Sequence, residues 1–270
     1  VVQKISSDGW QQNVYETVNW DVSPVRPVFG PSGGRMLLDI PLGRGSVKVA
    51  VWKVQVGRVP LFLMDTNVEG NSPQDREISG RLYGGDRTMR LRQEIILGIG
   101  GVRVLRALGV HPAVFHANEG HSSFLFIELA REKVSSGVVL DEALRQVGAN
   151  TVFTTHTPVE AGHDVFAEEM IAEYFSNYWP QLGVDRERFM DFARVPGHAG
   201  WNMTALAQKI AGRRNAVSRR HGQVSRDMWK SLWPSLPESE IPIGHVTNGV
   251  HLPTWVNQAI AETYDRHLGP

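Results

Sequence analysis

The apolar residues in the first part of the chain are spaced as in β-strands. Val47, Val49 and Val51 alternate with other residues, so that they share one face of an extended segment over 47–56. A second apolar run follows over 61–67 after a short turn that contains glycine, and two such runs are typical of a β-hairpin. We therefore expect a β-rich N-terminal portion.

From residue 91 onward, the apolar residues recur at helical intervals. This spacing predicts a helix over 91–108. Its interior contains Gly98, Gly100 and Gly101, although glycine is about 1 kcal/mol less favourable than alanine within a helix. Two interpretations remain open: close packing against a neighbouring element, or approach of the backbone to a sugar or phosphate.

A strand–helix–strand unit is predicted in the middle of the chain. Short apolar runs over 112–118 and 150–156 both end in polar residues, as buried parallel strands do. Helical patterns over 122–133 and 141–147 lie between these runs. Such a crossover joins parallel strands of one sheet and is normally right-handed.

The rest of the chain is predicted to be mainly helical. We expect helices over 168–179, 203–229 and 254–268, with a further strand over 241–249. The sequence contains no internal repeat and no flexible linker. The fold class is therefore α/β, with extra helices, and we expect residues 1–270 to form a single α/β domain.

Polar residues at the ends of the two central strands are candidates for a functional site. Asn118 and Glu119 end the first strand, and Thr155 and His156 end the second. Ligands of open α/β sheets bind beyond the carboxyl ends of the strands, and histidine can bond hydroxyls through both ring nitrogens. Structural roles also remain open, with Glu119 favoured by a helix dipole and His156 in contact with solvent.

The residues next to these site candidates suggest few other kinds of binding or catalysis. His116 and His121 flank the glutamate, but their spacing is not that of a zinc motif, and we expect no metal. Ser122 is expected to cap the following helix. The basic pair at Arg219 and Arg220 indicates a solvated helix face, with a phosphate- or glucan-binding role as the alternative.

Composition excludes several classes of function. The chain has no cysteine, which excludes disulfides and thiolate chemistry and is typical of a cytoplasmic protein. Lys and Arg together number 28, as do Asp and Glu, so no net charge favours nucleic acid or an anionic membrane, although a local basic patch remains open. No apolar run approaches the ~18–20 residues that a membrane span needs.

Taken together, these segments resemble the α-glucan phosphorylases, the family of glycogen and maltodextrin phosphorylases. The resemblance is closest to the shorter bacterial-type branch. Seven segments occur in the family's order: SDGW, VWKVQVGRVPLFLMDTN, RLYGGD, RLRQEIILGIGG, VFHANEGHSSF, VFTTHTPVEAGHDVF and HVTNGVHLPTW. One segment alone would be weak evidence, but seven in order, over almost the whole chain, are specific.

The resemblance implies an activity and a site. The family cleaves α-1,4-glucans with inorganic phosphate and releases glucose 1-phosphate with retention of configuration. Its fold is a GT-B arrangement, of which this chain would be the Rossmann-like N-terminal half. His156 would be catalytic, with its ring on the primary hydroxyl of the sugar and its carbonyl facing the developing positive charge. Asn118, Glu119 and Thr155 would bind the substrate, and Asp86 would belong to the loop that covers it.

The resemblance also implies a missing part. The family's coenzyme, pyridoxal phosphate, is bound by a lysine of the C-terminal half, and no sequence resembling that half is present. We therefore expect a fragment that is inactive alone and tends to form homo-oligomers through surface that the other half would cover. Two other functions remain open: a GT-B glucosyltransferase that uses a nucleotide sugar, and a glucan-binding module without catalysis.

Overall fold

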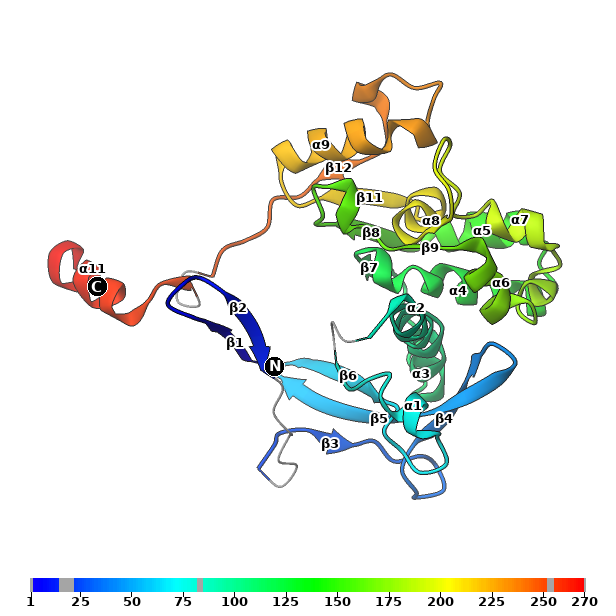
Figure 1. The fold of residues 1–270 in the computed structure, drawn as a ribbon, viewed down its shortest axis with the longest axis horizontal. Coiled ribbons are helices and arrows are strands. Elements are labelled where there is room, and N and C mark those ends of the chain that lie inside the picture. The colour runs from blue at the N-terminus through cyan, green and yellow to red at the C-terminus, as the bar shows by residue number, and fades with distance from the viewer. Residues whose placement is uncertain (1, 15–21, 82–84, 252–254, 270) are drawn as a thin grey trace.

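The computed structural model describes residues 2–14, 22–81, 85–251 and 255–269 (Figure 1). Its N-terminal portion is β-rich, as expected, and consists of a two-stranded ribbon and an antiparallel sheet around the long strand β5. The strands are β1 (Val2–Ile5), β2 (Gln11–Val14), β3 (Arg26–Pro27), β4 (Leu37–Leu42), β5 (Gly45–Val56) and β6 (Val59–Asp65). The predicted hairpin is confirmed, because Val56 pairs with Val59 across a turn in which Gly57 has a φ of +57°.

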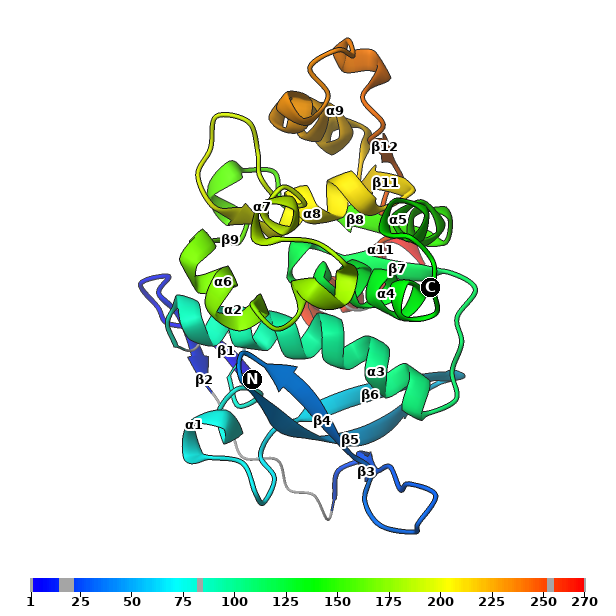
Figure 2. The same cartoon turned by 90° about the vertical axis from the view of Figure 1, so that its right-hand side faces the viewer.

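One long helical segment crosses a face of this sheet (Figure 2). After the short helix α1 (Pro73–Arg76), it consists of α2 (Arg87–Ile95), the π-helical turn η1 (Ile96–Gly100) and α3 (Gly101–Ala107). A Cβ atom on Gly98 would lie 2.7 Å from the Cβ atom of Phe124 and 2.8 Å from the backbone nitrogen of Leu125. The packing interpretation is therefore confirmed for Gly98.

The second sheet is parallel and contains the predicted strand–helix–strand unit. Its strands follow the order β12-β11-β8-β7, and the chain passes from β7 through two helices to β8. The elements are β7 (Phe115–Asn118), α4 (Phe124–Ser135), α5 (Leu140–Ala149), β8 (Thr151–Thr155), β11 (Arg213–Ala216) and β12 (Gly244–His245). The chain is thus a mixed α/β fold with a parallel sheet.

The prediction of one continuous helix over 203–229 is wrong in the middle of this range. Helices α8 (Met203–Ile210) and α9 (Arg219–Trp229) are separated by strand β11, which pairs with β8 on one side and β12 on the other. The strand reads Arg-Arg-Asn-Ala, so it lacks the apolar pattern of a central strand. Its hydrogen bonds to both neighbours, rather than its side chains, place it in the sheet.

The remaining elements surround the parallel sheet, except for the last helix. They are η2 (Gly120–Ser122), η3 (Glu160–Gly162), β9 (Val165–Phe166), α6 (Glu168–Phe175), η4 (Trp179–Leu182), α7 (Arg186–Met190), β10 (Trp201–Asn202), η5 (Lys230–Leu232), η6 (Glu238–Glu240) and α11 (Gln258–Leu268). Helix α11 lies away from the body of the molecule and buries none of its residues (Figure 1). None of the helices in the described part of the chain has the length and apolar character needed to cross a bilayer.

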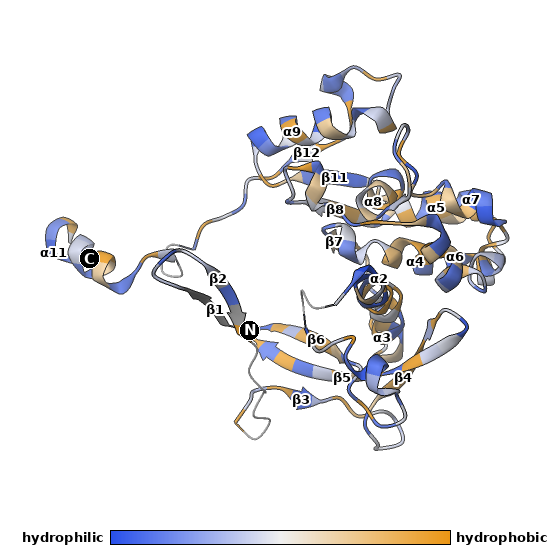
Figure 3. Cartoon of the chain, in the orientation of Figure 1, coloured by the Kyte–Doolittle hydropathy of each residue, from blue (hydrophilic) through white to orange (hydrophobic). Residues whose placement is uncertain are grey.

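A single apolar cluster connects the two sheets. It includes Ile40 and Val49 of the antiparallel sheet together with Phe153 of the parallel sheet, and apolar residues gather on the helices between them (Figure 3). Aromatic rings fill its centre, with Phe124 stacked on Phe175 at 4.8 Å between ring centroids. Most of the described chain therefore shares one core, and the extent of a single domain over 1–270 stays a prediction.

A buried carboxylate fastens helix α4 within this core. Glu128 is 0% exposed and accepts hydrogen bonds from Arg103 at 2.8 Å, from Arg131 at 2.7 Å and from the hydroxyl of Tyr178. Burial alone would raise the pKa of Glu128, but these hydrogen bonds outweigh it and hold the pKa below its ordinary value. The carboxylate is therefore charged and paired at neutral pH.

Candidate functional site

The carboxyl ends of β7 and β8 bring three of the predicted site residues together. Asn118 pairs in register with Thr154, so His156 emerges from the sheet beside Asn118. The Nε2 atom of His156 lies 2.8 Å from Oδ1 of Asn118. Because this amide oxygen can only accept, Nε2 of His156 carries the proton and donates it. The exposed imidazole is thereby oriented, and its Nδ1 atom remains for another partner.

Glu119 holds the backbone of the same histidine. Its Oε1 atom accepts the backbone N–H of His156 and, at 3.1 Å, the hydroxyl of Thr157. Its own backbone has a φ of +67° and a ψ of 166°, a conformation that is almost confined to glycine and costs about 1–3 kcal/mol. The expected cap at this turn is wrong, because neither Glu119 nor Ser122 caps a helix through its side chain.

Residues next to Asn118, Glu119 and His156 form further hydrogen bonds that hold these strand ends in place. The hydroxyl of Thr154 donates to Oδ1 of Asn215 at 2.9 Å, so Nε2 of His116, 2.7 Å away, must donate to that hydroxyl. On the other side, Nε2 of His221 donates to the carbonyl of Thr157 at 3.2 Å. The role of Asn215 was not predicted, because the strand that carries it has no apolar pattern.

Thr155 and Asp86 are placed differently from the other candidates. Side chains alternate across a strand, so Thr155 faces away from Thr154 and His156. It is 1% exposed, and its hydroxyl has no hydrogen-bond partner among the described residues. Asp86 is exposed and begins helix α2, where its carboxylate accepts the backbone N–H of Met89 at 2.9 Å. Residues 82–84 of the predicted covering loop lie outside the described residues.

A partly buried cluster of ionisable residues lies close to the turn at Glu119 and was not predicted. Arg90 donates to Oδ2 of Asp164 at 3.0 Å, and its Nε atom lies 2.8 Å from Oε1 of Glu94. Burial, followed by repulsion from Asp164, raises the pKa of Glu94 to about 9, so this carboxyl is protonated at neutral pH. Burial, followed by the charge of Arg90, lowers the pKa of His121, which is therefore neutral.

The cluster lies at the wall of a cavity of about 700 Å³ between β6 and α2. In the sequence, the only sign of this cluster was the i, i+4 spacing of Arg90, which directly precedes the predicted helix, and Glu94 within it. The contact with Asp164 joins segments that are 74 residues apart, and no local pattern reveals such a contact. It ties helix α2 to the segment that follows His156.

The lysines do not suit a Schiff base beside His156. The half-buried Lys209 donates to the backbone carbonyls of Asp191 and Arg194, both at 2.7 Å, at the amino end of the parallel sheet. No described lysine forms a hydrogen bond with His156, Asn118 or Glu119, so this part of the chain does not fit pyridoxal phosphate. Among the described residues, no group of three or more His, Asp or Glu side chains could hold a metal ion.

Comparison with known proteins gives consistent matches over almost the whole chain. The chain is 39% identical to a maltodextrin phosphorylase of Thermococcus litoralis, over 99% of this chain and 32% of that protein. It is 42% identical to a glycogen phosphorylase of Mycobacterium tuberculosis, over 94% of this chain and 31% of that protein. It is 37% identical to a glycogen phosphorylase of Aquifex aeolicus, over 100% of this chain and 39% of that protein. No family model matches the chain.

The matches agree with the resemblance that the sequence motifs indicate. The chain spans about a third of the length of the curated relatives that it matches. Over that third, the chain matches members of the glycogen and maltodextrin phosphorylase family at 37–42% identity.

Proposed function

We propose that this chain forms part of an α-glucan phosphorylase that cleaves α-1,4-glucans with inorganic phosphate. In this reaction the bond from C1 to the bridging oxygen breaks, the bridging oxygen takes up a proton, and phosphate bonds to C1 with retention of configuration. The observation that carries the proposal is the group formed by Asn118, Glu119 and His156 at the carboxyl ends of two parallel strands. Support also comes from the names of the relatives.

His156 would contact the glucosyl unit directly. Its Nε2 atom is occupied by Asn118, which leaves Nδ1 to accept a hydrogen bond from a sugar hydroxyl. The imidazole is exposed, so a ligand can reach it. Its backbone carbonyl would face the positive charge that develops at C1 as the glycosidic bond breaks.

Glu119 would act on the same charge through its position. Its carboxylate binds the backbone N–H of His156 and the hydroxyl of Thr157. A fixed negative charge beside the sugar favours a transition state that carries positive charge, and it needs no rearrangement during the reaction. The strained backbone of Glu119 agrees with this role, since strain of this kind concentrates at functional sites.

The proposed catalytic unit is larger than this chain. We propose that the parallel sheet is the Rossmann-like half of a GT-B fold and that a second half completes the cleft, with Asp86 in the covering loop and Thr155 near the substrate. One wall of a cleft can neither exclude water nor align glucan with phosphate, so we expect the 270 residues alone to be inactive.

The test is release of glucose 1-phosphate from maltodextrin and phosphate, with this chain and a full-length protein that contains it assayed side by side. We expect release by the full-length protein alone. Turnover by the chain would contradict its predicted inactivity. If neither protein is active, assays with UDP- and ADP-glucose would test a nucleotide-sugar transferase, and titration with maltodextrin would test a glucan-binding module.

A further inference from the structure

The proposed site depends on two chain segments that must be held together. Glu119 and His156 are 37 residues apart, yet the carboxylate of one has to stay on the backbone N–H of the other. The turn that contains Glu119 and the segment that follows His156 both contact the amino end of helix α8. This helix end is therefore placed to fix one segment relative to the other.

The turn at Glu119 rests on Thr204, in the first turn of α8. A Cβ atom on Gly120 would lie 2.7 Å from Oγ1 of Thr204 and 3.1 Å from the backbone nitrogen of that residue. Gly120 is buried and directly follows the strained Glu119. Only glycine allows such a close approach, so the path of the backbone at Glu119 depends on where Thr204 lies.

The segment that follows His156 rests on the same helix end. The backbone N–H of Met203 donates to the carbonyl of Asp164 at 3.0 Å. The hydroxyl of Thr204 lies 2.9 Å from Nδ1 of His163, whose side chain is buried. Thr204 thus contacts one segment by packing and the other by a hydrogen bond.

The contacts of His163 fix the direction of this hydrogen bond. Its Nε2 atom lies 3.3 Å from Sδ of Met228, and a thioether can only accept, so Nε2 carries a proton. Burial lowers the pKa of His163, so the ring is neutral at neutral pH, and Nδ1 accepts the hydroxyl proton of Thr204. The ring also meets Trp229 edge-on, with 5.0 Å between the ring centroids. The imidazole is thus held in one orientation, and it orients the hydroxyl of Thr204.

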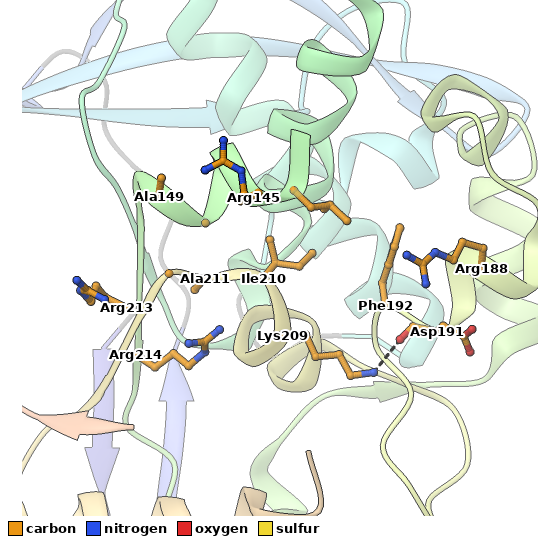
Figure 4. A pocket seen from close by; sticks show the side chains of 13 residues that line it. Arg145, Ala149, Arg188, Asp191, Phe192, Lys209, Ile210, Ala211, Arg213 and Arg214 are labelled. Atoms are coloured by element: carbon orange, nitrogen blue, oxygen red, sulfur yellow. Dashed lines mark hydrogen bonds between the residues drawn. The ribbon is translucent and has the colours of Figure 1, made fainter. Parts of the chain in front are cut away.

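Helix α8 can support these contacts because both of its ends are fastened. Asn202 caps the amino end through its side chain, which accepts a backbone N–H at 2.9 Å. At the carboxyl end, Lys209 donates to the carbonyls of Asp191 and Arg194, both at 2.7 Å, and Figure 4 shows the contact with Asp191. Residues 203–208 are all buried. A packed helix holds neighbouring groups more precisely than a loop does.

The cavity at the carboxyl end of α8 is basic, but its charges do not converge. It has a volume of about 890 Å³. The cationic side chains in its wall are those of Arg145, Arg188, Lys209, Arg213 and Arg214. Figure 4 shows Arg213, Arg214 and Lys209 pointing in different directions. The local basic patch that the composition leaves open is found here, and in it Lys209 fastens the helix.

We propose that Thr204 and His163 are positioning residues of the proposed site. They hold the carboxylate of Glu119 on the backbone N–H of His156. Through its contact with Gly120, Thr204 fixes the turn, and His163 fixes the segment that follows the other strand. This inference rests on the proposed function. Glu119 would act on charge that develops only in the transition state, so a shift of its carboxylate should lower kcat and leave KM nearly unchanged.

Hydrogen exchange in the 270-residue chain tests the positioning directly. Thr204→Val removes the hydroxyl but keeps the shape of the side chain. We expect the backbone amide of His156 to exchange about tenfold faster in this variant, as on loss of one hydrogen bond, which NMR measures. The matched control is Thr151→Val, which removes an equally buried hydroxyl that donates to the carbonyl of Val147 at 2.8 Å. It lies at the other end of β8 and should leave this exchange rate unchanged.

Phosphorolysis by a full-length protein that contains the chain tests the consequence. Thr204→Val should lower kcat by about 10²-fold, the effect of a misplacement of about 1 Å, with KM nearly unchanged. Thr204→Ser keeps the hydroxyl and should keep most of the activity, whereas Thr151→Val should match the wild type. Gly120→Ala disturbs the same contact from the other side and should act as Thr204→Val does.

A purely structural role would give a different pattern. Thr204→Val would then lower the urea midpoint as Thr151→Val does, with wild-type exchange at His156 and wild-type kcat, and the inference would be overturned. Wild-type exchange in Gly120→Ala, or equal losses in Thr204→Val and Thr204→Ser, would also overturn it. If the full-length wild type shows no phosphorolysis, the proposed function fails, and exchange at His156 still decides whether Thr204 positions the pair.

Discussion

The strained backbone of Glu119 predicts an inverted order of stability between two substitutions. Glu119→Ala and Glu119→Gly both remove the carboxylate that binds His156 and Thr157, so they lose the same hydrogen bonds. Only glycine also relieves the backbone, whose φ is +67° and ψ 166°. The difference between the two variants therefore isolates the strain.

The magnitude follows from two opposing effects. Relief of the strain should stabilise the glycine variant by about 1–3 kcal/mol relative to alanine. The greater freedom of glycine in the unfolded chain offsets about 0.5–1 kcal/mol of this gain. We therefore expect Glu119→Gly to be more stable than Glu119→Ala by roughly 1 kcal/mol, the reverse of the usual order.

Urea denaturation of the chain measures this difference as a change in transition midpoint at constant m value. A matched control pair is Gln223→Ala and Gln223→Gly, at an exposed position inside helix α9, where alanine should be the more stable by about 1 kcal/mol. If alanine were the more stable residue at position 119 as well, the inference of strain would be refuted.

Three further predictions concern the site and the core. In a full-length protein, His156→Ala should lower phosphorolysis by at least ~10²-fold, and wild-type activity would remove His156 from the site. Glu128→Gln should destabilise the chain by about 3 kcal/mol, because two half-buried arginines and a buried tyrosine lose their carboxylate partner. The pKa of Glu128 is lowered on folding, so the stability that this carboxylate adds is present above pH ~4.3 and is lost as the pH falls further. The urea midpoints of wild type and variant should therefore converge in acid. A difference between the midpoints that stays constant with pH would contradict this reasoning. Gly98→Ala should cost about 1–3 kcal/mol through overlap with Phe124, and an unchanged urea midpoint would show that helix α4 can shift.

The parts of the site that could be predicted from the sequence depend on local patterns. Apolar runs that end in polar residues placed Asn118, Glu119 and His156 at the carboxyl ends of parallel strands, where the structure brings them together. Thr155 belongs to the same segment, but the alternation of side chains turns it to the opposite face. Its neighbour Thr154 instead forms the hydrogen bonds with His116 and Asn215.

The parts that could not be predicted depend on segments that are far apart in the chain. Strand β11 has polar side chains, and only pairing with its neighbours makes it a central strand. The contacts of Asn215 were therefore hidden, as was the approach of Asp164 to Arg90. Spacing along a helix indicates which residues share a face, but it does not indicate what covers that face.

The sequence by itself determined the α/β class, the hairpin, the strand–helix–strand unit and the resemblance to the phosphorylases, because hydrophobic periodicity and ordered motifs are properties of contiguous residues. Only the tertiary structure decided where charges gather. A composition of 28 cationic and 28 anionic residues is compatible with an even surface, yet folding collects cations around one cavity and buries a protonated Glu94 beside Asp164. Electrostatic interaction depends on distance in space and on burial, and both are set by the packing of distant segments.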